Sequence, residues 1–185
     1  MRRERLRRAY TAEELQRRYP QPHEHFGNHD HRVRVAVTIQ IAKALAGNAE
    51  SSADLSCGDA AILCAVPAKK RYFGDFAPGW PIVGPIESTI DHIPHVDLFI
   101  CCETVEHLDD PDTVLKSIRD KTDALVLSTP VGCFHDQNPE HYWAWDREAI
   151  EQMLDAARFT PVLYASVDFR MHGPDHYEFA IFGCR

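Results

Sequence analysis

Residues 97–111 read DLFICCETVEHLDDP, a stretch with the pattern of a strand, a turn and the start of a helix. The run Leu98–Cys102 is continuously apolar, as in strands that are buried on both faces of a parallel sheet. Pro111, directly after Asp110, is typical of the first turn of a helix. Ligands of parallel sheets bind beyond the carboxyl ends of the strands, so we expect chemistry at the polar segment Glu103–His107.

Strand-like and helix-like segments alternate on both sides of this stretch. We expect strands over residues 52–56, 69–75, 81–87, 97–102, 123–130, 161–169 and 177–183, and helices over 11–19, 29–47, 110–121 and 145–159. The apolar face of the second helix is predicted to hold Val33, Val37, Ile41, Ala44 and Leu45. Thr11 and Glu14 form a capping-box pattern at the first helix. The alternation indicates an α/β fold, a three-layer sandwich with a mostly parallel sheet and an antiparallel hairpin at its C-terminus. We divide the chain into an N-terminal helical arm and lid over 1–48 and a main domain over 49–185.

Composition and charge narrow the classes of function. Hydrophobic residues make up 44% and charged residues 26% of the 185 residues, as in globular proteins. No run reaches the roughly 18 apolar residues of a membrane helix, and no apolar segment follows the basic N-terminus, so we expect a cytoplasmic protein that binds no membrane. The net charge is −8, yet residues 1–34 hold nine arginines against five acidic residues. This arm is the segment suited to nucleic acid, and the alternative is a solvated face of Arg/Glu pairs.

A second motif is the stretch ADLSCGDAA over residues 53–61, at the end of the first central strand. Gly58 allows backbone N–H groups to approach a ligand in such a strand-to-helix turn, although a purely structural turn has the same pattern. Asp54 at the strand end can accept hydrogen bonds from a ligand amine. Asp75 ends the next strand, where an acidic side chain can bind the two ribose hydroxyls of a nucleoside or simply belong to the turn GDFAPG.

The order of these motifs resembles that of class I S-adenosylmethionine-dependent methyltransferases, from about Asp54 to the C-terminus. The matching positions of the longer segment are Asp97, Cys101, Cys102, Glu103, Glu106, His107, Leu108, Asp110 and Pro111, followed by the strand ending in LSTP. The turn over 54–60 is similar to the family's Asp-Leu-Gly-Cys-Gly-x-Gly. The resemblance implies a Rossmann-like sheet in the domain 49–185. It also implies methyl transfer from S-adenosylmethionine to an oxygen or nitrogen of a small or medium-sized acceptor.

The resemblance further implies the contacts of the cofactor. Asp54, Ser56 and Gly58 would hold the methionine part, Asp75 would bind the ribose, Ile86 and Glu87 at the end of the third strand would flank the adenine, and Cys102 and Glu103 would line the site. Two of the family's glycines are replaced here, by Ser56 and Ala60. The segment between Asp75 and Asp97 has no room for full helices. We therefore expect a pocket that is either more open than usual or closed by the N-terminal arm.

Two histidines are candidate catalytic residues, His107 in the segment 103–107 and His141 ahead of an aromatic pair. Small-RNA 3′-terminal 2′-O-methyltransferases have a similar arrangement and bind a divalent metal, for which the matching ligands here would be Glu103, Glu106, His107 and His141. Such a metal would lower the pKa of a ribose hydroxyl. Because Glu-His is common at this place in enzymes without a metal, we favour a metal-free site. There, His107 orients the substrate or caps its helix, and His141 lines the acceptor pocket.

Candidate acceptor contacts lie in two idiosyncratic segments, and those in the second segment have packing as their alternative. They are Tyr19, His29 and His31 in the arm, and Phe134, His135 and Trp143 after the strand 123–130. The run of His23, His25, His29 and His31 can also bind a transition metal or form a polar loop.

Three functions stay open: a methyltransferase for a small-molecule acceptor, a metal-assisted enzyme for an RNA end, and a methyltransferase-like binding protein without turnover.

Overall fold

A seven-stranded sheet forms the centre of the protein. The computed structural model describes residues 1–24 and 27–185, so His25 of the histidine run lies outside the described residues. The strands are β2 (Ser51–Asp54), β3 (Lys70–Asp75), β4 (Ile82–Val83), β5 (Leu98–Cys102), β6 (Leu125–Val131), β8 (Pro161–Asp168) and β9 (Glu178–Cys184). They lie in the order β4-β3-β2-β5-β6-β9-β8. Among these strands β9 alone runs in the opposite direction, antiparallel to β6 and β8, which confirms the mostly parallel sheet with a C-terminal hairpin.

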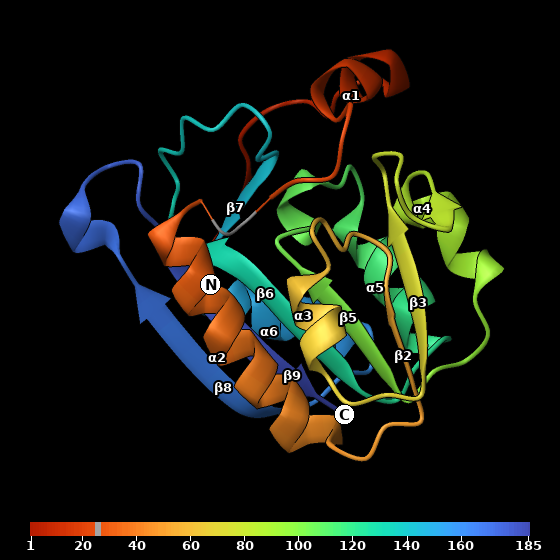
Figure 1. Ribbon diagram of the computed structural model, residues 1–185. Coiled ribbons are helices and arrows are strands. Elements are labelled where there is room, and N and C mark those ends of the chain that lie inside the picture. Colours follow the sequence, from red (N-terminus) through yellow and green to blue (C-terminus); the bar gives the residue numbers. More distant parts are fainter. Residues whose placement is uncertain (25–26) are drawn as a thin grey trace.

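Helices cover both faces of the sheet (Figure 1). The helices α2 (His29–Ala46) and α3 (Ala61–Ala65) lie on the near face in this view, while α5 (Pro111–Arg119) and α6 (Arg147–Ala156) lie behind it. Because successive residues of a strand point to opposite faces, Phe99 joins the core under α5 and α6, and Ile100 joins the core under α2 and α3. The predicted three-layer sandwich is confirmed. No helix among the described residues is long and apolar enough to cross a bilayer.

The third strand is shorter than the sequence predicts. The strand β4 ends at Val83, and Pro85 precedes the short helix α4 (Ile86–Thr89), which continues into the 3₁₀ turn η1 (Ile90–His92). Proline has no N–H for a strand ladder and fits the start of a helix. The predicted place of Ile86 and Glu87 at a strand end was therefore wrong: Ile86 is buried in the core, and Glu87 is exposed on the first turn of α4.

The buried face of α2 also differs from the sequence prediction. Its buried residues are Asp30, Arg34, Val35, Thr38, Ile41, Ala42 and Leu45. Val33 and Val37 are only partly buried, and Ala44 is exposed. Apolar spacing gave the helix correctly and placed Ile41 and Leu45 on its buried face, but it missed the rest of that face, because polar side chains are buried near the N-terminal end. They find partners there, as when Arg34 donates to the Ser128 hydroxyl at 3.3 Å.

The N-terminal arm is tied to the body by a strand that the sequence did not predict. The strand β1 (Arg3–Arg5) pairs antiparallel with β7 (Trp143–Trp145), and the helix α1 (Ala12–Arg18) follows with the predicted Thr11–Glu14 capping box. The guanidinium groups of Arg3 and Arg5 lie 4.5 and 5.1 Å from the centre of the Trp143 ring. Ion pairs join Arg3 to Asp112, Arg5 to Asp109 and Arg8 to Glu14. Much of the positive charge of the arm is thus neutralised within the protein.

Candidate functional site

The turn after β2 and the end of β3 meet in one hydrogen-bonded unit. Gly58, in the left-handed region at φ 52°, donates its N–H to Oδ2 of Asp75 at 2.8 Å. The other carboxylate oxygen of Asp75 accepts from the N–H of Ala77 at 2.9 Å. Trp80 donates its indole N–H to the Gly58 carbonyl at 2.9 Å. The end of β3 and the loop that follows it therefore fix the turn that the sequence singled out.

The two residues that replace the family's glycines fit the turn in different ways. Ser56 directs its hydroxyl to Oγ1 of Thr104 at 2.7 Å and donates its backbone N–H to Asp54 at 3.0 Å. Ala60 takes the left-handed conformation itself, at φ 58°, which costs a residue with a Cβ roughly 1–2 kcal/mol. The turn keeps its glycine-like backbone at a modest energetic cost.

Arg34 is a site residue that sequence reasoning missed. Its side chain is 1% exposed, and it lines a small cavity together with Asp54, Ser56 and Cys102. The Nε of Arg34 has no hydrogen-bond partner in the described part of the chain and lies 3.9 Å from a carboxylate oxygen of Glu103. Burial raises the pKa of Asp54 to about 7, and the neighbouring Asp75 adds to this, while hydrogen bonds from Ser56 oppose it. One cation and several acids thus meet under the N-terminal end of α2.

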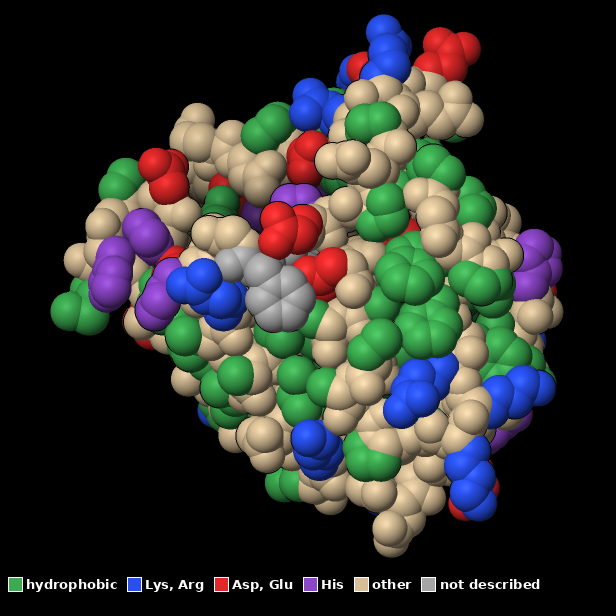
Figure 2. All heavy atoms as spheres, viewed as in Figure 1, with side chains coloured by type: hydrophobic (Ala, Val, Ile, Leu, Met, Phe, Trp, Pro, Cys, Tyr) green, Lys and Arg blue, Asp and Glu red, His purple; other side chains and the backbone are tan. Residues whose placement is uncertain are grey.

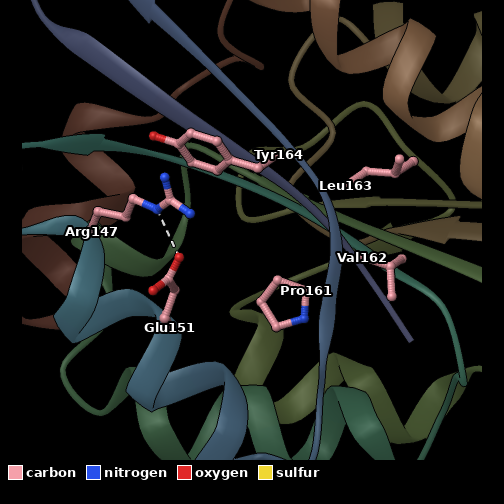
Figure 3. Close-up of a pocket in the computed structure, with 6 residues that line it drawn as sticks. All are labelled: Arg147, Glu151, Pro161, Val162, Leu163 and Tyr164. Atoms are coloured by element: carbon pink, nitrogen blue, oxygen red, sulfur yellow. Dashed lines mark hydrogen bonds and ion pairs between the residues drawn. The ribbon is translucent and has the colours of Figure 1, made fainter.

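The cavity beside the turn is small, and a larger groove lies elsewhere. The cavity encloses about 10 Å³, so a methionine-sized group enters only if the side chains around it move apart. A groove of about 350 Å³ lies at the amino end of β8, where Arg147 pairs with Glu151 and lies over Tyr164 (Figure 3). That groove is far from the carboxyl ends of the parallel strands. Near the N-terminal end of α2, in contrast, acidic and histidine side chains gather at the surface (Figure 2).

A second polar cluster follows β5 and lies beside the loop before β7. Glu106 and His107 belong to the 3₁₀ turn η2 (Val105–His107), and the His141 ring lies 4.9 Å from the His107 ring. Nδ1 of His141 is 2.5 Å from Asp136, whose other carboxylate oxygen accepts from the Tyr177 hydroxyl at 3.0 Å. Neither Asp136 nor Tyr177 was predicted: Asp136 lies five residues before His141 in the same loop, without a pattern that singles it out, and Tyr177 reaches the cluster from a distant segment.

Burial and mutual repulsion shift the protonation of this cluster. Burial, reinforced by the nearby Glu103, raises the pKa of Glu106 to about 8. Burial and the neighbouring His141 lower the pKa of His107 to about 3. Burial opposes a charge on His141, but the hydrogen bond with Asp136 and the proximity of Glu106 outweigh it and raise the pKa. His107 is therefore neutral at neutral pH, and His141 is a stronger base than a free imidazole.

The remaining predicted residues fall into two groups. Near the turn and Arg34 lie Cys102 in the cavity wall, Glu103, which accepts from the Ser128 hydroxyl, and His31, whose Nδ1 is 3.3 Å from Arg34. The others make contacts outside these two polar clusters: Tyr19 with Phe76, His29 with Asp30, Phe134 under Arg2, Trp143 under Arg3, while His135 is exposed. Their predicted contacts with an acceptor stay predictions.

No family model and no curated protein sequence matches this chain. Solved structures do match it. The N-methyltransferase NodS from Bradyrhizobium japonicum, in complex with S-adenosyl-L-homocysteine, has a TM-score of 0.67 at 13% identity, over 94% of this chain and 98% of that one. The magnesium protoporphyrin IX methyltransferase from Synechocystis, also with bound S-adenosylhomocysteine, has a TM-score of 0.63 at 14% identity, over 94% and 93%. The [4+2]-cyclase SpnF has a TM-score of 0.71 at 11% identity, over 98% of each chain. The chain therefore has the α/β fold of S-adenosylmethionine-dependent methyltransferases, a fold that carries other chemistry as well.

Proposed function

We propose that this protein binds S-adenosylmethionine and transfers its methyl group to an oxygen or nitrogen of a small or medium-sized acceptor. The observation that carries the proposal is the hydrogen bond of 2.8 Å between the Gly58 N–H and Asp75. It joins a glycine turn, which suits the methionine end of the cofactor, to an acidic strand end, which suits a ribose. The proposal further rests on the fold and on the order of the sequence motifs.

The charges around the turn match the cofactor. Each oxygen of Asp75 accepts one N–H, and since a carboxylate oxygen has two lone pairs, both can still accept from ribose hydroxyls. Asp54 is suited to the ammonium group of the methionine part, and Arg34 to its carboxylate. We propose Arg34 as a cofactor contact in addition to those that the sequence suggested.

The methyl transfer itself needs mainly alignment and the exclusion of water. S-adenosylmethionine supplies a sulfonium methyl group that an acceptor atom attacks in line. A base is needed only where the acceptor must lose a proton, and in the protein without a bound metal His141, held by Asp136, is the side chain suited to that role. Tyr19 of the arm lies 6.1 Å from the Phe76 ring, beside the turn that holds Asp75. This contact favours a pocket closed by the arm over an open one.

A small acceptor is favoured over an RNA end. The body of the protein is acidic, and Arg3, Arg5 and Arg8 are engaged in ion pairs rather than displayed to a phosphate backbone. The alternative of a binding protein without turnover is distinguished by experiment. A protein that binds the cofactor but produces no S-adenosylhomocysteine with any acceptor would support it.

Calorimetric titration with S-adenosylmethionine and S-adenosylhomocysteine tests the proposal. We expect binding in the micromolar range, with a loss of roughly tenfold or more for Asp75→Asn, because a neutral amide is a weaker acceptor for two hydroxyls. Asp91→Asn is the matched control, since this side chain is 85% exposed and pairs with Lys121. No binding at high micromolar concentration would refute both enzyme functions.

Cofactor affinity is expected to rise with pH through Asp54. With a pKa of about 7, Asp54 is mostly protonated at pH 6 and mostly ionised at pH 8, and only the ionised form pairs with an ammonium group. Affinity for S-adenosylhomocysteine should therefore increase by about tenfold between pH 6 and pH 8. Titrations at pH 6, 7 and 8 measure this. The increase should be absent in Asp54→Asn and absent with 5′-methylthioadenosine, which lacks the amine; an equal increase in either control contradicts the role of Asp54.

A further inference from the structure

Three potential ligand atoms converge beside the end of β5. Glu106, His107 and His141 each contribute one of these atoms, and the three atoms lie within 4.8 Å of one another. Glu106 and His107 come from the turn η2, whereas His141 comes from the loop that precedes β7. The cluster is thus built from two segments of the chain that only the fold brings together.

His107 presents a lone pair to this cluster. Its Nδ1 lies 2.8 Å from the carbonyl oxygen of Glu140. A carbonyl oxygen can only accept, so Nδ1 carries the proton, and Nε2 of the neutral ring is left as an acceptor. This Nε2 lies 3.8 Å from Oε1 of Glu106. When the Glu106 carboxylate is ionised, both atoms are acceptors, so they cannot form a hydrogen bond with each other.

His141 is held in the same tautomer by two neighbours. Its Nδ1 lies 2.5 Å from Asp136, which accepts the proton, and its Nε2 lies 3.1 Å from Nδ2 of Asn138. The orientation of the Asn138 amide is fixed, because its oxygen accepts from the backbone N–H of Glu140 at 3.0 Å. Asn138 therefore donates a hydrogen bond to Nε2 of His141, so this nitrogen carries a lone pair. A metal ion can bind that lone pair in place of the Asn138 amide.

Glu106 supplies the third ligand atom, Oε1. The residue is 1% exposed; Oε2 accepts from the Thr129 hydroxyl at 3.1 Å, but Oε1 is buried without a hydrogen bond among the described residues. A buried carboxylate oxygen without a partner carries an uncompensated cost of desolvation. Arg34 does not compensate it, since its guanidinium contacts Ser128 and lies near Glu103.

We propose that Glu106, His107 and His141 bind one divalent transition-metal ion. Two imidazoles and a carboxylate suit zinc, iron or cobalt, and each imidazole is oriented by an acceptor on its far nitrogen, as in metal sites of known proteins. Atoms that share such a metal lie about 3–3.5 Å apart, so the side chains must close by roughly 1.5 Å. Glu103, a fourth candidate from the sequence, bonds to Ser128 at 2.8 Å and is not part of this site. Three protein ligands leave a position for water or an acceptor oxygen.

Titration of the metal-free full-length protein with Co²⁺, followed by visible absorption, and with Zn²⁺, followed by calorimetry, tests this site without any cofactor. We expect one tightly bound ion per chain, with a dissociation constant at least about 100-fold weaker in Glu106→Gln or His141→Gln. Asp136→Asn should weaken binding by about 10- to 100-fold, because it releases the ring of His141 without removing a ligand. His107→Gln is the variant least prone to unfolding, since this ring is 25% exposed.

The matched controls lie in the other histidine-rich part of the protein. His29 and His176 both contact Asp30, at 3.3 and 2.5 Å. The variants His29→Gln and His176→Gln therefore show whether the metal ion binds to this second histidine group instead. These variants should bind Co²⁺ as the wild type does. The proposal is overturned if the wild type binds neither ion more tightly than about 100 μM, or if binding survives Glu106→Gln and His107→Gln but is lost in His176→Gln. Because the readout is metal binding, failure here leaves the proposed methyl transfer untouched.

Discussion

Replacing Arg34 by methionine is expected to weaken the binding of S-adenosylhomocysteine by about 100-fold. The guanidinium is 1% exposed, lines the cavity beside the turn and has an Nε without a hydrogen bond to residues 1–24 or 27–185, so a carboxylate there would gain a buried, charge-assisted partner. Truncating one member of such a buried pair typically costs about 2–5 kcal/mol. Calorimetric titration of wild type and variant measures the loss.

A ligand that lacks the methionine part separates recognition from folding. If Arg34 contacts the ligand carboxylate, Arg34→Met should leave the affinity for 5′-methylthioadenosine within about twofold of the wild type. An equal loss for both ligands would mean that Arg34 only supports the fold. Arg32→Met is a control on the exposed side of the same helix and should change neither affinity.

Stability needs its own control, because Arg34 lies 3.9 Å from Glu103. Removing the cation leaves a nearly buried carboxylate without its partner, which is costly. In urea unfolding, Glu103→Gln should therefore recover part of the stability that Arg34→Met loses. The affinity for S-adenosylhomocysteine should stay low in the double variant, whereas Glu103→Gln alone measures what Glu103 contributes to the cofactor.

The sheet and the turn of the site could be predicted because local patterns determine them. The continuously apolar run of β5 and the apolar start of β6 indicate burial on both faces, and the end of β5 places Glu103 and the turn η2 at the carboxyl edge of a parallel sheet. Asp54 and Asp75 follow from the same rule, since each ends a strand. Pro85 could have corrected the third strand, because a proline there ends strand pairing.

The missing site residues could not be predicted because contacts made in the folded chain, many of them between distant segments, give them their place in the site. Arg34 interrupts the apolar spacing of its helix, and the fold brings it to Ser128 near the carboxyl edge of the sheet. Asp136 is one of many loop acids until His141 and Tyr177 approach it. The pairing of β1 with β7 joins segments at opposite ends of the sequence, and no local pattern in RER reveals it.

The second large effect that we expect concerns Trp145 of β7, the strand that pairs with β1. Trp145→Ala should lower the free energy of unfolding by about 3–5 kcal/mol, because the ring is fully buried in the core between β7 and α6. The indole N–H also donates to Oγ1 of Thr129 at 3.2 Å and to the carbonyl of Pro130 at 3.1 Å. Thr129 in turn donates to Glu106, so the loss should extend to the second polar cluster. Urea unfolding of wild type and variant measures the change.

Two comparisons decide whether packing or the hydrogen bonds of Trp145 matter more. Trp145→Phe keeps much of the volume but leaves the Pro130 carbonyl without its donor, so it should lose only about 1–3 kcal/mol. Trp143→Ala should cost less than Trp145→Ala, because the Trp143 ring is only partly buried and stacks with Arg3 and Arg5. If Trp143→Ala instead left stability unchanged and raised the KM for an acceptor, its contact with the arm would be secondary to substrate binding. A loss for Trp143→Ala as large as that for Trp145→Ala would instead make the arm, and not the central core, the main source of stability around β7.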